Sequence, residues 1–212
     1  MGVMIDGKWT TDEEASKLKH EDGRWIRPTS SIRHWVTADG SPGPTGDGGF
    51  AAEPGRYHLF VSYGCPWAHR TLLFRRLKGL EGLISVSVTR PRRTDDGWVF
   101  DDDGEYRDVC LGKHALWEVY AESHPGFTGR VTVPLLYDKK TGTAVSNESA
   151  DIVRMLNSAF DAVGANDLDF YPSEHRDEID RLNQRIYENL NNGVYRAGFA
   201  ETQEAYEEGF DD

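Results

Sequence analysis

The pattern of hydrophobic and polar positions becomes regular from Tyr57 onward. Residues 57–62 (YHLFVS) have the composition of a buried strand, and Gly64-Cys65-Pro66 interrupts the run. Leucines then recur at helical spacing from residue 72 to residue 80, which predicts a helix that begins near Pro66. Apolar and serine positions alternate over residues 83–88, as expected of a second strand. The order strand, helix, strand predicts two parallel strands joined by the helix.

The stretch that follows predicts an antiparallel end to the same sheet. Residues 97–106 (GWVFDDDGEY) are interpreted as a short strand and an acidic turn, and a helix is expected from about 113 to 123. Residues 131–137 and 143–145 flank the turn sequence DKKTG and predict a β-hairpin that closes the other edge of the sheet. A further helix should present one apolar stripe, formed by Ile152, Val153, Leu156 and Phe160.

After Asp161 the pattern is helical only. An apolar stripe on a helix near 174–190 comprises Ile179, Leu182, Ile186 and Leu190, and a second helical stretch begins near Glu201. One and a half helices cannot bury such a stripe by themselves. They either pack on the preceding α/β part or belong to a helical domain that is cut short, and we favour the second interpretation.

Composition and charge disfavour several classes of function for the protein. The 212 residues include 24 basic and 36 acidic side chains, which give a formal net charge of −12. This acidity disfavours nucleic acid and anionic membrane as partners, because both are bound by clustered Lys and Arg. No apolar run approaches the roughly 20 residues that span a bilayer, and the polar start lacks the apolar core of a signal peptide. We therefore expect a soluble, cytoplasmic protein.

The candidate chemistry is concentrated at Cys65. Of the two cysteines, Cys65 and Cys110, neither belongs to a Cys-x-x-Cys pair, and no ligand spacing indicates a metal site. A cysteine between a strand end and a helix start meets the positive end of the helix dipole and unpaired backbone N–H groups, which favour the thiolate. Because position 68 is Ala68, a mixed disulfide on Cys65 is expected to be opened by a thiol from solution. Cys110 could open it only if the fold brought it close, and we interpret Cys110 as structural. The alternative interpretation of Cys65 is a small buried hydrophobic residue.

Two further segments suit a bound thiol peptide. A proline at the head of a strand, as in Val133-Pro134, can adopt cis geometry and leave the preceding backbone free to pair with an extended peptide. Ser149 is expected at a helix N-terminus, where N–H groups and a hydroxyl suit a carboxylate, and Glu148 beside it suits an ammonium group. Together they match the zwitterionic end of a γ-glutamyl group. The alternative is an ordinary helix cap with an acidic first turn.

Three motifs, in this order, carry a family resemblance: Cys-Pro-Trp-Ala at 65–68, Arg-Val-Thr-Val-Pro at 130–134 and Asn-Glu-Ser-Ala-Asp at 147–151. They resemble the glutathione transferases whose first domain is thioredoxin-like. More specifically, the chain resembles the glutathionyl-hydroquinone reductases, the omega-like xi class of that superfamily. The resemblance covers roughly residues 30–212 and extends through the segments 38–46, 97–100, 154–157 and 191–195.

The resemblance implies a fold and a domain organisation. An α/β thioredoxin-like, glutathione-binding domain, built from a βαβ unit, a β-hairpin and a helix, is expected over residues 50–162. The beginning of an all-α C-terminal domain, apparently truncated, is expected over residues 171–212. Residues 1–49 carry little periodic pattern and are expected to form an irregular N-terminal extension.

The resemblance also implies a role for each matching residue. Cys65 would be the catalytic nucleophile, and Tyr195 would face the quinol as proton donor or acceptor. Trp98 would contact glutathione with its ring, although a strand anchor in the core is the alternative for this residue. The implied glutathione-binding residues are Trp98, Arg130, Val131, Thr132, Val133, Glu148 and Ser149.

The implied activity is the glutathione-dependent reduction of glutathionyl-hydroquinones to hydroquinones, through a mixed disulfide between Cys65 and glutathione. Two alternatives stay open: an omega-like thioltransferase or dehydroascorbate reductase, and a non-catalytic thiol-binding protein. Glutathione would be the co-substrate, and γ-glutamylcysteine stays open because it shares the γ-glutamyl end. The implied partners are small-molecule thiols and quinols and, for the full-length chain, a second copy in a homodimer; nucleic acid, membrane and metal are not expected.

Overall fold

The computed structural model describes residues 2–17 and 19–211, and the chain divides into two compact units. The first unit comprises Met1–Ser16 and Ser30–Asp169, and the second comprises Lys17–Thr29 and Phe170–Asp212. Within the described ranges, none of the helices has the length and apolar character that crossing a membrane would require.

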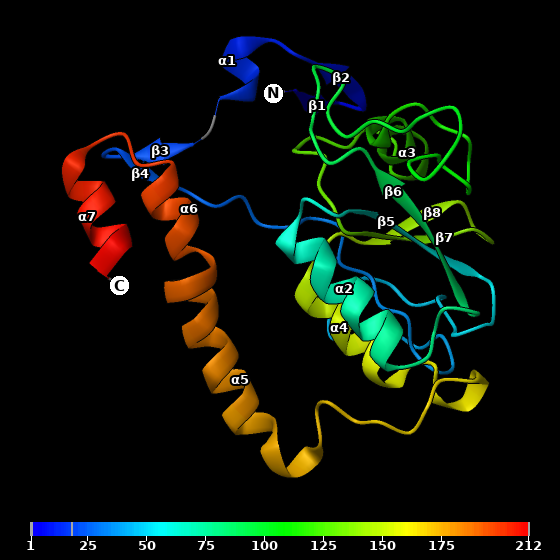
Figure 1. The fold of residues 1–212 in the computed structure, drawn as a ribbon. Coiled ribbons are helices and arrows are strands. Elements are labelled where there is room, and N and C mark those ends of the chain that lie inside the picture. The colour runs from blue at the N-terminus through cyan, green and yellow to red at the C-terminus, as the bar shows by residue number, and fades with distance from the viewer. Residues whose placement is uncertain (1, 18, 212) are drawn as a thin grey trace. The chain divides into compact units, whose positions relative to one another are not determined.

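A four-stranded sheet in the order β6-β5-β7-β8 forms the centre of the first unit (Figure 1). Its strands are β5 (Tyr57–Ser62), β6 (Ile84–Thr89), β7 (Leu135–Asp138) and β8 (Thr143–Ser146). β5 and β6 are parallel, whereas β7 pairs antiparallel with both β5 and β8. The βαβ unit and the β-hairpin predicted from the sequence are confirmed.

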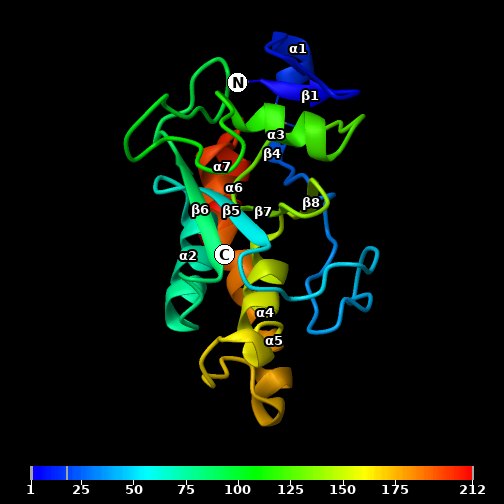
Figure 2. The ribbon, with the colours of Figure 1, turned by 90° about the vertical axis from the view of Figure 1, so that its right-hand side faces the viewer.

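Helices cover both faces of this sheet. α2 (Pro66–Leu77) and α4 (Ser149–Ser158) contact each other on one side, and α3 (Leu116–Ser123) lies on the other (Figure 1, Figure 2). Every side chain of β5 is buried, as expected of a central strand with helices above and below it. The core between the layers contains fully buried side chains, among them Leu59, Phe60, Leu116, Leu136 and Ile152.

Residues 1–49 do not form the single irregular extension that was expected. β1 (Val3–Ile5) and β2 (Lys8–Thr10) make an antiparallel hairpin, and α1 (Glu13–Ser16) follows. Residues 32–34 run beside β8, where His34 N–H donates to Val145 O at 2.8 Å and Asn147 N–H donates to Ile32 O at 3.0 Å. This pairing covers the edge that β8 would otherwise leave open. Its partners are remote in sequence, so local periodicity carries no sign of it.

Two predicted elements between β6 and α3 also differ. Residues 97–106 form isolated bridges and turns, not a strand. The helix expected from residue 113 begins at Leu116. The Glu118 carboxylate accepts hydrogen bonds from the N–H groups of His114 and Ala115, each at 2.9 Å, and so holds these two residues ahead of the first helical turn.

Over its described residues, the second unit combines a short hairpin with three α-helices. β3 (His20–Glu21) pairs with β4 (Arg24–Trp25), α5 (Arg176–Arg185) continues into a π-helical turn at Ile186–Asn191, and α6 (Gly193–Gly198) and α7 (Gln203–Asp211) follow. Glu201 N–H donates to Gly23 O at 2.9 Å, and Arg24 forms ion pairs with Glu204 and Glu208. The hairpin of β3 and β4 is therefore tied to the helices near the end of the chain.

His58 is a buried histidine in the centre of the sheet. Its Nδ1 lies 2.7 Å from Ser85 Oγ and its Nε2 lies 2.9 Å from Ser87 Oγ. Burial lowers the pKa of His58 to about 4, against a weaker opposing effect of the nearby Asp108 carboxylate. The imidazole is therefore neutral at pH 7 in the folded chain.

We expect His58 to make the chain sensitive to mild acid. In the unfolded chain the pKa of a histidine is about 6.5, so the unfolded state takes up the proton first. Its contribution to stability is complete above pH 6.5 and is lost as the pH falls towards 4, with a loss of about 2 kcal/mol at pH 5. Urea titrations between pH 7 and 4.5 measure this loss. His58→Gln should flatten the pH dependence of the free energy of unfolding in that window. The control His114→Gln, at an exposed position, should leave this pH dependence unchanged. An equal pH dependence for His58→Gln and the parent chain would contradict the assignment.

Candidate active site

Cys65 lies at the junction of β5 and α2, as the sequence predicted. It is the residue before the first helical turn, with φ −110° and ψ 114°, and Pro66 occupies the first helical position. Its carbonyl oxygen accepts the hydrogen bond of His69 N–H at 3.0 Å, so the backbone of α2 begins directly at the cysteine. The thiol is half-buried. It therefore stands at the positive end of the helix dipole, in a position that an added molecule can reach.

The second predicted segment faces this thiol. The peptide bond between Val133 and Pro134 is cis, and Cys65 Sγ donates to Val133 O at 3.4 Å. Val131 and Val133 are buried, whereas Thr132 between them is exposed. The backbone just before β7 consequently runs past the sulfur of Cys65.

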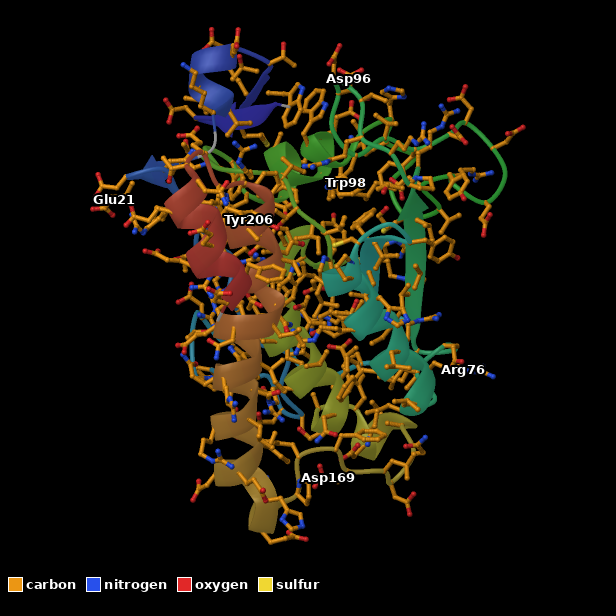
Figure 3. The ribbon with its side chains drawn as sticks, turned by 60° about the vertical axis from the view of Figure 1, so that its left-hand side comes forward. Glu21, Arg76, Asp96, Trp98, Asp169 and Tyr206 are labelled. Atoms are coloured by element: carbon orange, nitrogen blue, oxygen red, sulfur yellow. The ribbon has the colours of Figure 1, made fainter. Side chains whose placement is uncertain are left out.

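The loop after β6 approaches the Cys65 turn closely. A Cβ atom on Gly64 would lie 2.9 Å from Pro91 O, so only glycine fits at this position without moving the loop. The same loop continues to Trp98, which follows the turn at Asp96 (Figure 3). Trp98 is half-buried, and the Arg93 guanidinium lies over its indole ring at 5.2 Å from the centroid. Burial, reinforced by the charge of Arg93, lowers the pKa of the Arg130 guanidinium.

A buried phenol joins two sides of the site. Tyr120 on α3 donates its hydroxyl to Thr132 O at 2.9 Å and lies 3.4 Å from Asn147 Nδ2, which donates to it. Burial raises the pKa of Tyr120. The segment before Pro134 and the segment before α4 are thus held to one neutral side chain.

Glu148 and Ser149 form the N-terminus of α4, as predicted. Glu148 Oε1 accepts from Ala150 N–H at 3.1 Å, and its Oε2 accepts from Ser30 Oγ at 2.9 Å. Ser149 is buried, and its Oγ accepts a hydrogen bond from Arg70 Nη1 at 3.1 Å. A carboxylate and a hydroxyl therefore stand side by side at the positive end of a ten-residue helix.

Sequence reasoning gave no role to Arg70 or Arg33. Arg70 follows Cys65 on α2, and its side chain reaches α4, whereas Arg33 forms two hydrogen bonds of 2.7 Å to the carboxylate of Asp151. The helical spacing places Arg70 on α2, but no local pattern indicates which neighbouring element its guanidinium contacts.

Tyr195 belongs to the second unit, on α6. Its ring stacks on Trp25 at 5.4 Å between centroids, and the Arg27 guanidinium lies over it at 5.1 Å. Its assignment to the same site as Cys65 stays a prediction.

The other cysteine has a different environment. Cys110 is half-buried, and burial together with the nearby Asp108 carboxylate raises the pKa of its thiol to about 11. The thiol is protonated at neutral pH, which suits a structural residue better than a nucleophile.

Comparison with known proteins shows which proteins the chain resembles. Residues 64–159 match the family described as glutathione S-transferase, N-terminal domain. The chain is 53% identical to the glutathionyl-hydroquinone reductase YqjG of Escherichia coli (strain K12) over 98% of its own length and 63% of that protein. The chain therefore contains the N-terminal domain of the glutathione S-transferase family, over residues 64–159. Its first unit is accordingly the thioredoxin-like N-terminal domain of that family, and the second unit is a helical C-terminal part.

Solved structures of the family support the same assignment. The glutathione-bound structure of the Escherichia coli K-12 protein superposes with a TM-score of 0.85 at 51% identity, over 98% of this chain and 62% of that one. A xi-class glutathione transferase from Natrialba magadii gives a TM-score of 0.83 at 44% identity, over 99% of this chain and 61% of that one. The chain spans less than two thirds of the length of these relatives.

Proposed function

We propose that the protein reduces glutathionyl-hydroquinones to hydroquinones, with glutathione as co-substrate and Cys65 as nucleophile. The observation that carries this proposal is the position of Cys65 Sγ at the start of α2, 3.4 Å from Val133 O. The name of the Escherichia coli relative and the glutathione in its structure support it. Because position 68 is alanine, the chemistry of this helix turn is that of a single thiol.

In the first half of the proposed cycle, the Cys65 thiolate attacks the sulfur of the glutathionyl-hydroquinone. The bond between that sulfur and the aromatic carbon breaks, its electron pair stays on the carbon, and the carbon takes up a proton. Cys65 is thereby oxidised to a mixed disulfide with glutathione, and the free hydroquinone leaves. Tyr195 is the proposed donor of the proton.

In the second half, the thiolate of another glutathione attacks the glutathione sulfur of the mixed disulfide. Oxidised glutathione leaves, and Cys65 returns to the thiolate. Two separate half-reactions of this kind predict ping-pong kinetics. The thiol peptide is proposed to pair with the backbone of Val133, to contact Trp98, Arg130, Val131 and Thr132, and to place its γ-glutamyl end at Glu148 and Ser149.

The setting of the whole protein is proposed on the same grounds. Two free thiols and a reduced glutathione co-substrate suit the cytoplasm. The proposed partners are a small-molecule thiol, a quinol and a second copy of the chain in a homodimer. Neither metal nor nucleic acid has a part in the proposed cycle.

A direct substrate comparison tests the proposal. With reduced glutathione present, the chain should convert glutathionyl-menadiol to menadiol and release one oxidised glutathione per turnover, as measured by chromatography. Dehydroascorbate should be reduced more slowly. Preference for dehydroascorbate supports an omega-like reductase instead, and the absence of both activities together with the absence of a glutathione adduct on Cys65 supports a non-catalytic protein.

A further inference from the structure

Arg70 links the helix that carries the thiol to the helix that carries Ser149. It lies on α2, five positions after Cys65, and its Nη1 donates to Ser149 Oγ on α4 at 3.1 Å. The guanidinium also lies over the ring of Trp67, 5.7 Å from the centroid. Both ends of the proposed thiol site, the sulfur of Cys65 and the hydroxyl of Ser149, therefore depend on α2.

Arg70 forms no direct ion pair within the described part of the chain, and the nearest compensating charge is the carboxylate of Glu148. Among the described residues, no carboxylate lies within ion-pair distance of its guanidinium, although the group is half-buried. The nearby Glu148 carboxylate is already engaged by Ser30 Oγ and Ala150 N–H. Arg33, by contrast, is fully paired with Asp151 through two hydrogen bonds of 2.7 Å. Burial lowers the pKa of Arg70, and the charge of the Glu148 carboxylate opposes this effect only in part.

The hydrogen bond from Arg70 also determines what the Ser149 hydroxyl can do. A hydroxyl has one hydrogen to donate and two lone pairs that accept. Since Arg70 Nη1 donates to Ser149 Oγ, one lone pair is occupied, and the hydroxyl hydrogen is left to donate to another group. A cation at this lone pair also polarises the O–H bond and strengthens that donation. Ser149 is thus prepared as a donor to an anion beside the N-terminus of α4.

We propose that Arg70 is a positioning residue that acts through Ser149 and makes the site selective for a ligand with an α-carboxylate on its γ-glutamyl end. The proposal rests on the proposed function, because it takes a γ-glutamyl thiol as the ligand. The guanidinium supplies the positive charge, Ser149 supplies the hydrogen bond, and the dipole of α4 adds to both. Glu148 beside them takes the ammonium group of the same ligand.

The test compares two ligands that differ in one group. Calorimetric titration under anaerobic conditions measures the Kd of reduced glutathione and of 4-aminobutyryl-cysteinylglycine, which lacks only the α-carboxylate. Arg70→Met should raise the Kd for glutathione by about tenfold or more, because charge-assisted hydrogen bonds are lost. It should leave the Kd for the decarboxylated ligand unchanged. Arg70→Lys should recover part of the loss.

A double-mutant cycle separates positioning from mere proximity. If Arg70 acts through Ser149, combining Arg70→Met with Ser149→Ala should cost little more than either change alone. Arg76→Met on the same helix, at an exposed position, serves as the control and should leave both Kd values unchanged. Far-UV circular dichroism checks that each variant is folded. If Arg70→Met does not fold, the Kd values of Arg70→Lys provide the test instead.

The outcomes distinguish the two proposals. If the parent chain binds neither ligand, the proposed function fails and the role of Arg70 fails with it. If the parent chain binds glutathione and Arg70→Met binds it equally well, only the role of Arg70 is overturned. Equal weakening of both ligands also overturns it, since that result describes a residue that only supports the fold. Additive costs in the cycle overturn it as well, since they describe a residue that acts independently of Ser149.

Discussion

Replacement of Cys65 with serine is expected to lower turnover of glutathionyl-menadiol by a factor on the order of a thousand or more. A serine hydroxyl is a far weaker nucleophile than a thiolate, and oxygen cannot form the disulfide on which the proposed cycle depends. The side chain keeps nearly the same size, and the N-terminus of α2 accepts serine well as a capping residue. The loss should therefore come from chemistry and leave the fold intact. Steady-state rates and intact mass after incubation with oxidised glutathione measure it.

The second cysteine provides the matched control. Cys110→Ser should keep the parent rate and still gain one glutathione on Cys65, because the raised pKa of Cys110 keeps that thiol protonated. An adduct that persists in Cys65→Ser and disappears in Cys110→Ser would identify Cys110 as the nucleophile and contradict the prediction. Retention of full turnover by Cys65→Ser would remove the proposed mechanism altogether.

Local patterns were sufficient for the elements around Cys65. The strand at 57–62, the helix start at Pro66 and the hairpin around the DKKTG turn were predicted close to the observed bounds. Each of these elements is indicated by a pattern of a few consecutive residues: alternation, helical spacing or a turn sequence. The position of Ser149 at a helix N-terminus followed for the same reason.

Contacts between distant segments were not predictable in this way. Met4 pairs with Gly129, and Trp9 stacks on Trp117 at 6.3 Å between ring centroids, yet residues 1–49 lack periodicity. Lys78 is another case, because a lysine is ordinarily exposed. Here it is buried, and its Nζ donates to Asp161 Oδ1 at 3.0 Å and to Asn166 O at 2.9 Å.

In the candidate site, too, local motifs were predictable and contacts between distant segments were not. Motif positions indicated Cys65, Val133, Glu148 and Ser149 as candidates, whereas the hydrogen bond from Arg70 to Ser149 emerged only from the packing of α2 against α4. A guanidinium can reach in several directions from a helix, and the sequence does not specify which one. The places of these candidate residues in the fold were thus predictable, whereas the hydrogen bond from Arg70 to Ser149 was not.

Replacement of Arg56 with methionine is expected to destabilise the first unit by about 3–5 kcal/mol. Arg56 and Asp138 form a buried ion pair, in which Arg56 Nε donates to Asp138 Oδ1 at 2.9 Å and Nη2 donates to Oδ2 at 2.5 Å. Burial pushes the pKa of Asp138 up, but hydrogen bonds from Arg56, Thr141 and the backbone N–H of Lys140 hold it below its usual value. Without Arg56, a fully buried carboxylate at the end of β7 loses its cation.

Urea unfolding followed by circular dichroism measures the loss, and amide hydrogen exchange of β5 and β7 locates it in the first unit. Arg76→Met is the matched control. Arg76 is exposed, with 82% of its side chain accessible, so solvent screens its pair with Glu81 and the variant should be far less destabilised than Arg56→Met (Figure 3). The double variant Arg56→Met with Asp138→Leu should recover part of the stability, because it removes the unpaired buried charge. The recovery should be incomplete, since Thr141 and the N–H of Lys140 lose their acceptor. Equal destabilisation by Arg56→Met and Arg76→Met would show that the buried pair contributes no more than a surface pair.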